Sequence, residues 1–113
     1  MILDFMNTMH SVENWHVLSL SSQMGNIGSE ISRAKNWRGR NDIQYIKALE
    51  RAFELLDLTL SDPARNHQLR EISRVREVLA DIYLGSFEYK TTLEDLDRYF
   101  MPFAIVARKE MNR

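Results

Sequence analysis

The chain contains no cysteine, and its 113 residues include only four glycines and two prolines. Without cysteine, a disulfide scaffold and a thiolate metal site are both excluded, and nothing in the sequence suggests secretion. Because glycine and proline are few, turns are few, and we expect a small number of long elements. No apolar run approaches the roughly 18 to 20 residues that a membrane span requires. The start is rich in apolar residues but lacks the basic residues of a signal peptide.

The chain also lacks an excess of charge of either sign. Its 15 basic and 16 acidic residues give a net charge of -1, so no overall field attracts nucleic acid or an anionic membrane. The length and the 44% hydrophobic content predict one globular domain over residues 1–113, located in the cytoplasm. Residues 1–12 form an apolar N-terminal arm, which we expect to dock on its own domain or on another subunit. The arm contains Ile2, Leu3, Phe5, Met6 and Met9.

A stripe of very small residues is the most informative feature that is present. Ser21, Gly25, Gly28 and Ser32 recur at spacings of four, three and four, which places them along one line of an α-helix. A glycine inside a helix costs about 1 kcal/mol relative to alanine. The stripe therefore predicts that a second helix, from this chain or from a partner, lies unusually close to this face.

Apolar residues repeat at spacings of three and four through most of the chain and predict four helices. The first runs from Asn14 to Trp37, and the second runs from Asp42 to Leu60 after a cap at Asn41 or Asp42. The third begins near Pro63 and stops at Gly85. The fourth opens with a capping box formed by Thr91 and Glu94 or by Thr92 and Asp95.

The short connections between these helices predict an all-α fold, a four-helix up-down-up-down bundle. Pro102 lies inside the pattern of the fourth helix and removes one backbone donor. We expect the fourth helix to be kinked at Pro102, and the alternative is two short helices that meet there.

A basic cluster with one aromatic residue is the strongest candidate for a nucleic-acid contact. It consists of Arg33, Lys35, Trp37, Arg38 and Arg40. Basic side chains beside a stacking aromatic ring can hold a nucleic-acid backbone and an unpaired base. Cations at a helix C-terminus also complement the helix dipole, and we prefer this simpler interpretation.

Two polar stripes could form a second candidate site. Asn26, Glu30 and Arg33 share one face of the first helix, and Arg74 lies in a similar stripe on the third. If the stripes faced each other, these residues would form a partly buried charged cluster. The more common arrangement is a solvated face with local ion pairs, such as one between Arg74 and Glu77.

Motifs for metal binding or catalysis are almost absent. Glu13 and His16 form one Glu-x-x-His pair, whereas di-iron bundles use two such pairs and two further glutamates. His10 and His67 share no ligand spacing with His16, and no phosphate loop or nucleophile elbow occurs. We therefore expect no metal and no cofactor.

The stretch from Leu18 to Lys109 resembles a group of small bacterial and archaeal helical proteins for which no activity is established. The residues that carry the resemblance are Gln23, the runs 25–30, 48–52 and 55–59, and the run 76–79. The architecture is more weakly similar to the four-helix proteins encoded in 23S rRNA intervening sequences, which oligomerise, and to HEPN proteins. The ribonuclease signature of HEPN proteins, an arginine followed four to six residues later by a histidine, is absent.

These observations favour a non-enzymatic helical interaction module that acts as a homo-oligomer, by default a dimer, or with a protein partner. We expect the N-terminal arm and the first helix at the interface. The resemblance to HEPN proteins implies the alternative, an RNA- or nucleotide-associated protein of a toxin–antitoxin or nucleotidyltransferase pair. No contact with a membrane is expected.

Overall fold

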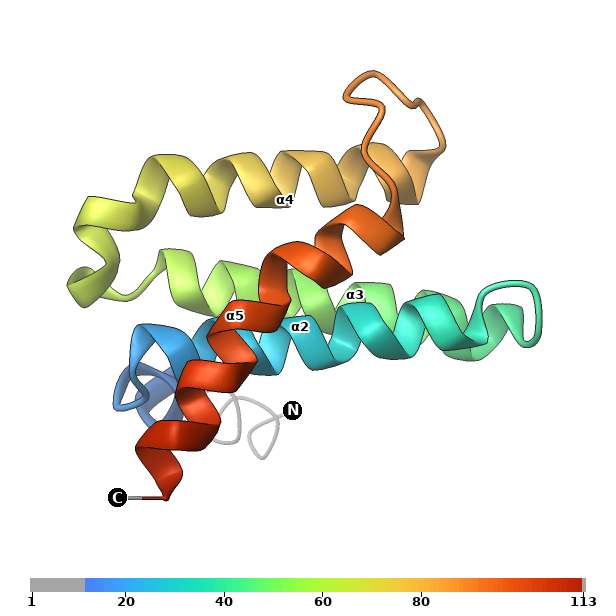
Figure 1. The fold of residues 1–113 in the computed structure, drawn as a ribbon. Helices are drawn as coiled ribbons and strands as arrows, with labels where there is room; N and C mark the ends of the chain where they lie inside the picture. The colour runs from blue at the N-terminus through green and yellow to red at the C-terminus, as the bar shows by residue number, and fades with distance from the viewer. Residues whose placement is uncertain (1–11, 113) are drawn as a thin grey trace, which may run out of the picture.

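The computed structural model of the chain describes residues 12–112, and all the regular structure in this range is helical (Figure 1). A short helical segment over residues 12–16 precedes the longer elements. These are α2 (Leu20–Trp37), α3 (Asp42–Leu60), the 3-10 helix η1 (Pro63–Gln68), α4 (Leu69–Leu84) and α5 (Leu93–Met111). None of the described helices combines the length and the apolar character that crossing a membrane requires.

Most helix ends lie where the capping residues predict them. The side chain of Asn41 accepts a hydrogen bond from the Gln44 N–H at 3.1 Å, and α3 keeps its predicted bounds. Gly85 ends α4 in the left-handed conformation, with φ of 73°. Thr92 and Asp95 form the expected reciprocal capping box at the start of α5.

Two of the predicted helices are shorter than expected. The prediction of one uninterrupted first helix was wrong, because the chain leaves the helical conformation over residues 17–19 and α2 begins at Leu20. There the Ser19 hydroxyl accepts from the Ser22 N–H at 3.1 Å, an N-cap bond that competes with a continuous helix. The third helix was predicted to begin near Pro63. Residues 63–68 instead form the 3-10 helix η1, and the α-helix α4 begins at Leu69.

Pro102 lies within a continuous α5, so the alternative of two short helices was wrong. Proline removes only one backbone donor, and the remaining turns continue on either side of it. The predicted kink at Pro102 stays a prediction.

The helix α2 is the centre of the arrangement. It packs against α3 and α5, whereas α4 packs against α3. In Figure 1, α2, α3 and α4 run in alternating directions, and α5 crosses α2 obliquely toward the C-terminus. The largest fully buried apolar side chains come from α2 to α5 and are Met24, Ile27, Ile31, Leu49, Leu56, Ile72, Leu79, Leu93 and Phe100.

Candidate functional site at the crossing of α2 and α5

The glycines of α2 lie where α5 crosses it. A Cβ atom built on Gly28 would lie 2.6 Å from the Cβ of Phe100, and one built on Gly25 would lie 3.3 Å from the Cα of Ala104. Real Cβ atoms do not come as close as 2.6 Å to another atom of this kind, so only glycine at position 28 allows α5 to lie at the observed distance. The predicted close helix neighbour is confirmed, and it belongs to the same chain.

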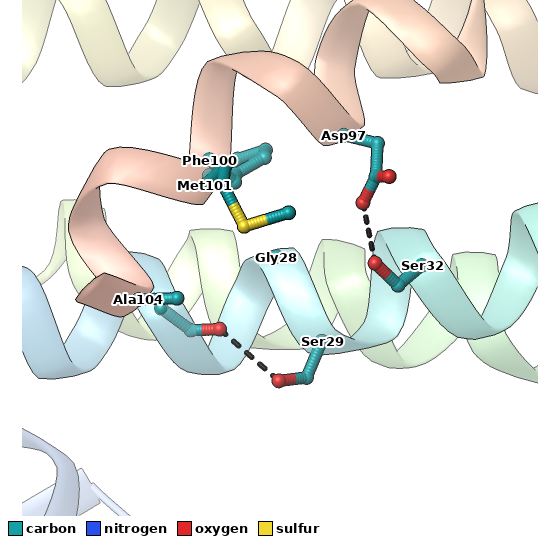
Figure 2. Close-up of a pocket in the computed structure, with 8 residues that line it drawn as sticks. Gly28, Ser29, Ser32, Asp97, Phe100, Met101 and Ala104 are labelled. Atoms are coloured by element: carbon teal, nitrogen blue, oxygen red, sulfur yellow. Dashed lines mark hydrogen bonds between the residues drawn. The ribbon is translucent and has the colours of Figure 1, made fainter. Parts of the chain in front are cut away.

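A small cavity of about 70 Å³ lies beside this crossing (Figure 2). Phe100 and Met101 reach into it from α5, while Ser29 and Ser32 border it from α2. Pockets that bind small molecules usually measure about 300 to 1,000 Å³. The cavity is therefore too small for a substrate of ordinary size.

Asp97 is the one ionisable side chain that lines this small cavity. The Ser32 hydroxyl donates to one of its carboxylate oxygens, and the Lys35 ammonium donates to the other at 2.8 Å. Burial by itself raises the pKa of Asp97, but these two partners outweigh burial, and the net pKa lies below the ordinary value. Asp97 therefore joins α5 to α2 through its contacts with Ser32 and Lys35.

Two larger grooves adjoin the crossing and meet at Ala104. One, of about 290 Å³, runs between α2 and α5, and the other, of about 280 Å³, lies along the C-terminal half of α5. Four large apolar side chains stand exposed between residues 101 and 111 of α5, and we call them the α5 face. They are Met101 at 50% exposure, Ile105 at 51%, Val106 at 44% and Met111 at 83%. Of these, Met101 and Ile105 lie one turn apart on the same side of the helix.

The predicted nucleic-acid contact lies at the end of α2 and in the loop that follows. Three of its cations are paired within the chain: Arg33 with Glu30 at 3.2 Å, Lys35 with Asp97 at 2.8 Å, and Arg38 with Glu94 at 2.6 Å. The hydrogen bond from Arg38 lowers the pKa of Glu94. Trp37 is 38% exposed and Arg40 is exposed, and the side chains of the paired Arg33 and Arg38 are 59% and 46% exposed.

The second predicted cluster is spread over two places. Asn26 donates to the Ser22 carbonyl at 2.8 Å and lines the groove between α2 and α5. Glu30 and Arg33 pair with each other on α2. Arg74 lies on α4, with its guanidinium over the ring of Tyr89 at 4.8 Å, and lines a separate hollow. Arg74 is therefore not gathered with the other three residues.

A buried polar network joins residues 12–19 to the corner between α3 and η1, and no pattern in the sequence predicted it. Trp15 Nε1 donates to the Thr59 hydroxyl at 2.8 Å. The fully buried Gln23 donates from Nε2 to the Trp15 carbonyl and to Asp62 Oδ2, both at 2.9 Å. Arg65 lies 3.5 Å from the same carboxylate oxygen. The network attaches the segment before α2 to the end of α3.

Asp62 is the charged centre of this network, and its side chain is almost fully buried. Burial raises the pKa of its carboxyl group, but hydrogen bonds from Gln23 and the Ala64 N–H, with the nearby charges of His16 and Arg65, outweigh burial and lower it. A single buried polar residue does not disturb a helical repeat, so periodicity could not reveal the network. The His16 ring is held close by, 3.0 Å from the Ser61 hydroxyl.

Comparison with known proteins gives no match: no protein-family model, no curated protein and no solved structure is similar to this chain. The resemblance to small bacterial and archaeal helical proteins therefore stays a prediction. The assignment of a function depends on the geometry described above.

Proposed function

We propose that the protein is a non-enzymatic interaction module that forms a homodimer through the α5 face. In this proposal the fold is a four-helix up-down-up-down bundle in which α5 is the fourth helix and bends at Pro102. The observation that carries the proposal is the exposure of the four side chains of the α5 face at the end of one helix.

Exposed apolar side chains that stand alone are normal on any protein surface, whereas a contiguous group is typical of a binding surface. Met101 and Ile105 are one helical turn apart and line the same groove beside Ala104. Removing such side chains from water is favourable by roughly 25 cal/mol per Å² of apolar area. A partner that covers the α5 face would therefore gain stability from it.

A second copy of this chain fits the surface because the surface offers both a ridge and a groove. Met101 and Ile105 are half exposed, and the neighbouring groove between α2 and α5 is lined by small residues that include Gly25, Ser29 and Ala104. In a two-fold dimer each surface meets its own copy, so the ridge of one subunit can enter the groove of the other.

The expected contribution of the N-terminal arm lies outside the described residues. The chain that follows the arm passes close to α5, because the Ser19 hydroxyl donates to Glu110 Oε2 at 2.7 Å. We propose that the arm adds apolar area to the same dimer.

The proposal of a non-enzymatic role is supported by the ion pairs that the charged side chains near the crossing form with one another. Two ion pairs lie near the crossing. Lys35 of α2 binds Asp97 of α5, and Arg38, directly after α2, binds Glu94 of α5. Paired charges of this kind hold helices in register, and the carboxylates of Asp97 and Glu94 are already engaged by cations of the same chain.

The mass of the full chain in solution at tens of micromolar tests the proposal. We expect a dimer from light scattering, and we expect Ile105→Glu to shift it to monomer, because a charge would be buried at the interface. Ile43→Glu is the matched control, since Ile43 is 67% exposed on α3, away from α5. A monomeric wild-type chain would overturn the dimer. A dimer that Ile105→Glu leaves intact would overturn the α5 face as its interface.

A further inference from the structure

An open hollow of about 580 Å³ lies on the side of α4 and has no part in the proposed dimer surface. Three of the residues that line it carry nitrogen groups: His67 at the end of η1, and Arg70 and Arg74 on α4. Arg70 and Arg74 are four residues apart and lie on the same side of α4. Ser73, Glu71 and Glu77 complete the lining.

The two glutamates of the hollow are hydrogen-bonded to tyrosines and not to the arginines. The Tyr99 hydroxyl of α5 donates to Glu71 Oε1, and the Tyr89 hydroxyl donates to Glu77 Oε2 at 3.0 Å. The ion pair expected between Arg74 and Glu77 does not form within the described residues. This arrangement leaves the guanidinium groups of Arg70 and Arg74 without a carboxylate partner in the described part of the chain.

This lack of partners contrasts with the neighbouring surface arginines. Arg76, on the same helix, donates to Asp57 at 2.6 Å, and Arg51 on α3 pairs with Glu54 at 2.9 Å. Two like charges four residues apart destabilise a helix, and a bound anion would reduce this repulsion. Arg70 and Arg74 are therefore available to an anionic ligand.

Arg74 is also held ready for a ligand. Its guanidinium carbon lies over the ring of Tyr89, 4.8 Å from the ring centre, and this contact restrains the side chain. Planar guanidinium groups bind phosphate oxygens with two parallel hydrogen bonds. Ser73 offers a hydroxyl donor in the same hollow.

We propose that the α4 hollow binds a small phosphomonoester that carries free hydroxyl groups, such as a sugar phosphate. Arg70 and Arg74 hold the phosphate, with His67 and Ser73 as further donors. The second carboxylate oxygens of Glu71 and Glu77 accept hydrogen bonds from ligand hydroxyls. The hollow is open to solvent, and its lining comes from one side of η1 and α4.

Titration of the full chain with glucose 6-phosphate, followed by the NMR signals of the arginine side chains, tests the site. We expect saturable binding with a Kd of about 1 mM or lower, and a loss of about tenfold or more for Arg70→Gln and for Arg74→Gln. Both positions are exposed, so the variants should fold, and circular dichroism checks this. Arg51→Gln is the matched control and should bind as the wild type does.

Two further ligands separate the parts of the proposal. Glucose should not bind, and inorganic phosphate should bind several-fold more weakly than glucose 6-phosphate. Equal binding of the two phosphates would overturn the role of the glutamates. An absence of saturation, or an equal loss in Arg51→Gln, would overturn the site.

Discussion

Gly28 of α2 and Phe100 of α5 touch at the point where the two helices cross, and a methyl group on Gly28 would lie 2.6 Å from the Phe100 Cβ. The Phe100 Cβ is bonded to the backbone and cannot turn away as the end of a long side chain could. Accommodating a larger residue at position 28 therefore requires α5 to move away from α2. The distance between these helices is set by the absence of a single side chain.

We expect Gly28→Ala to destabilise the protein, although alanine favours a helix by about 1 kcal/mol over glycine. Overpacking in a well-packed core costs roughly 1 to 3 kcal/mol, and here it acts on backbone positions. Gly25→Ala is the matched variant, because its added Cβ would lie 3.3 Å from the nearest atom, the Ala104 Cα. Urea denaturation should show a clearly larger loss for Gly28→Ala. Equal stability of the two variants would contradict the close crossing.

Thr59 holds Trp15 against the end of α3, and Thr59→Val should release it. The hydroxyl accepts from Trp15 Nε1 at 2.8 Å and donates to the Leu55 carbonyl at 2.8 Å. A buried indole N–H without an acceptor costs about 1 to 3 kcal/mol. Thr91→Val, at a site away from the core, should change the stability by less than about 0.5 kcal/mol. Tryptophan fluorescence during denaturation measures both, and a neutral Thr59→Val would contradict the role of this bond.

Acid should lower the free energy of unfolding through protonation of Asp62 and Asp97. Their pKa values are lower in the folded chain than the ordinary value of aspartate. A group with a lowered pKa stabilises the fold fully above its unfolded pKa, about 3.9 for aspartate. This contribution is lost as pH falls from that value through the lower folded pKa. We expect the free energy of unfolding to drop below about pH 4, and to drop less steeply in Asp62→Asn. An unchanged slope in that variant would exclude Asp62 as a source.

RNA association through Arg33, Lys35, Trp37, Arg38 and Arg40 stays a prediction, and the ion pairs in the structure limit its strength. Replacing Arg38 and Arg40 by alanine should weaken retention of a mixed RNA pool at low salt. Binding that depends on phosphate contacts falls steeply as salt rises. Replacing Arg51, which lies outside this cluster, should leave retention unchanged. If the wild-type chain retains no RNA at low salt, this function is excluded.

The helices could be predicted because their signals are local. The apolar repeat and the Asn41 cap determine α3, Gly85 ends α4, and Thr92 with Asp95 begins α5. The stripe of small residues that contains Gly25 and Gly28 also predicted that another helix packs closely against α2. In each case the physical cause, a side-chain spacing or a capping hydrogen bond, lies within about one turn of the residue concerned.

The sequence by itself determined that the chain is helical, where most helices end, and that something must lie against Gly25 and Gly28. Only the tertiary structure decided that this neighbour is α5 and that Gln23 and Asp62 meet Trp15 in a buried network. It also decided that Arg74 lies apart from Asn26. These contacts are between residues far apart in the chain. They depend on how the helices cross, and the spacing of residues within one helix does not determine that.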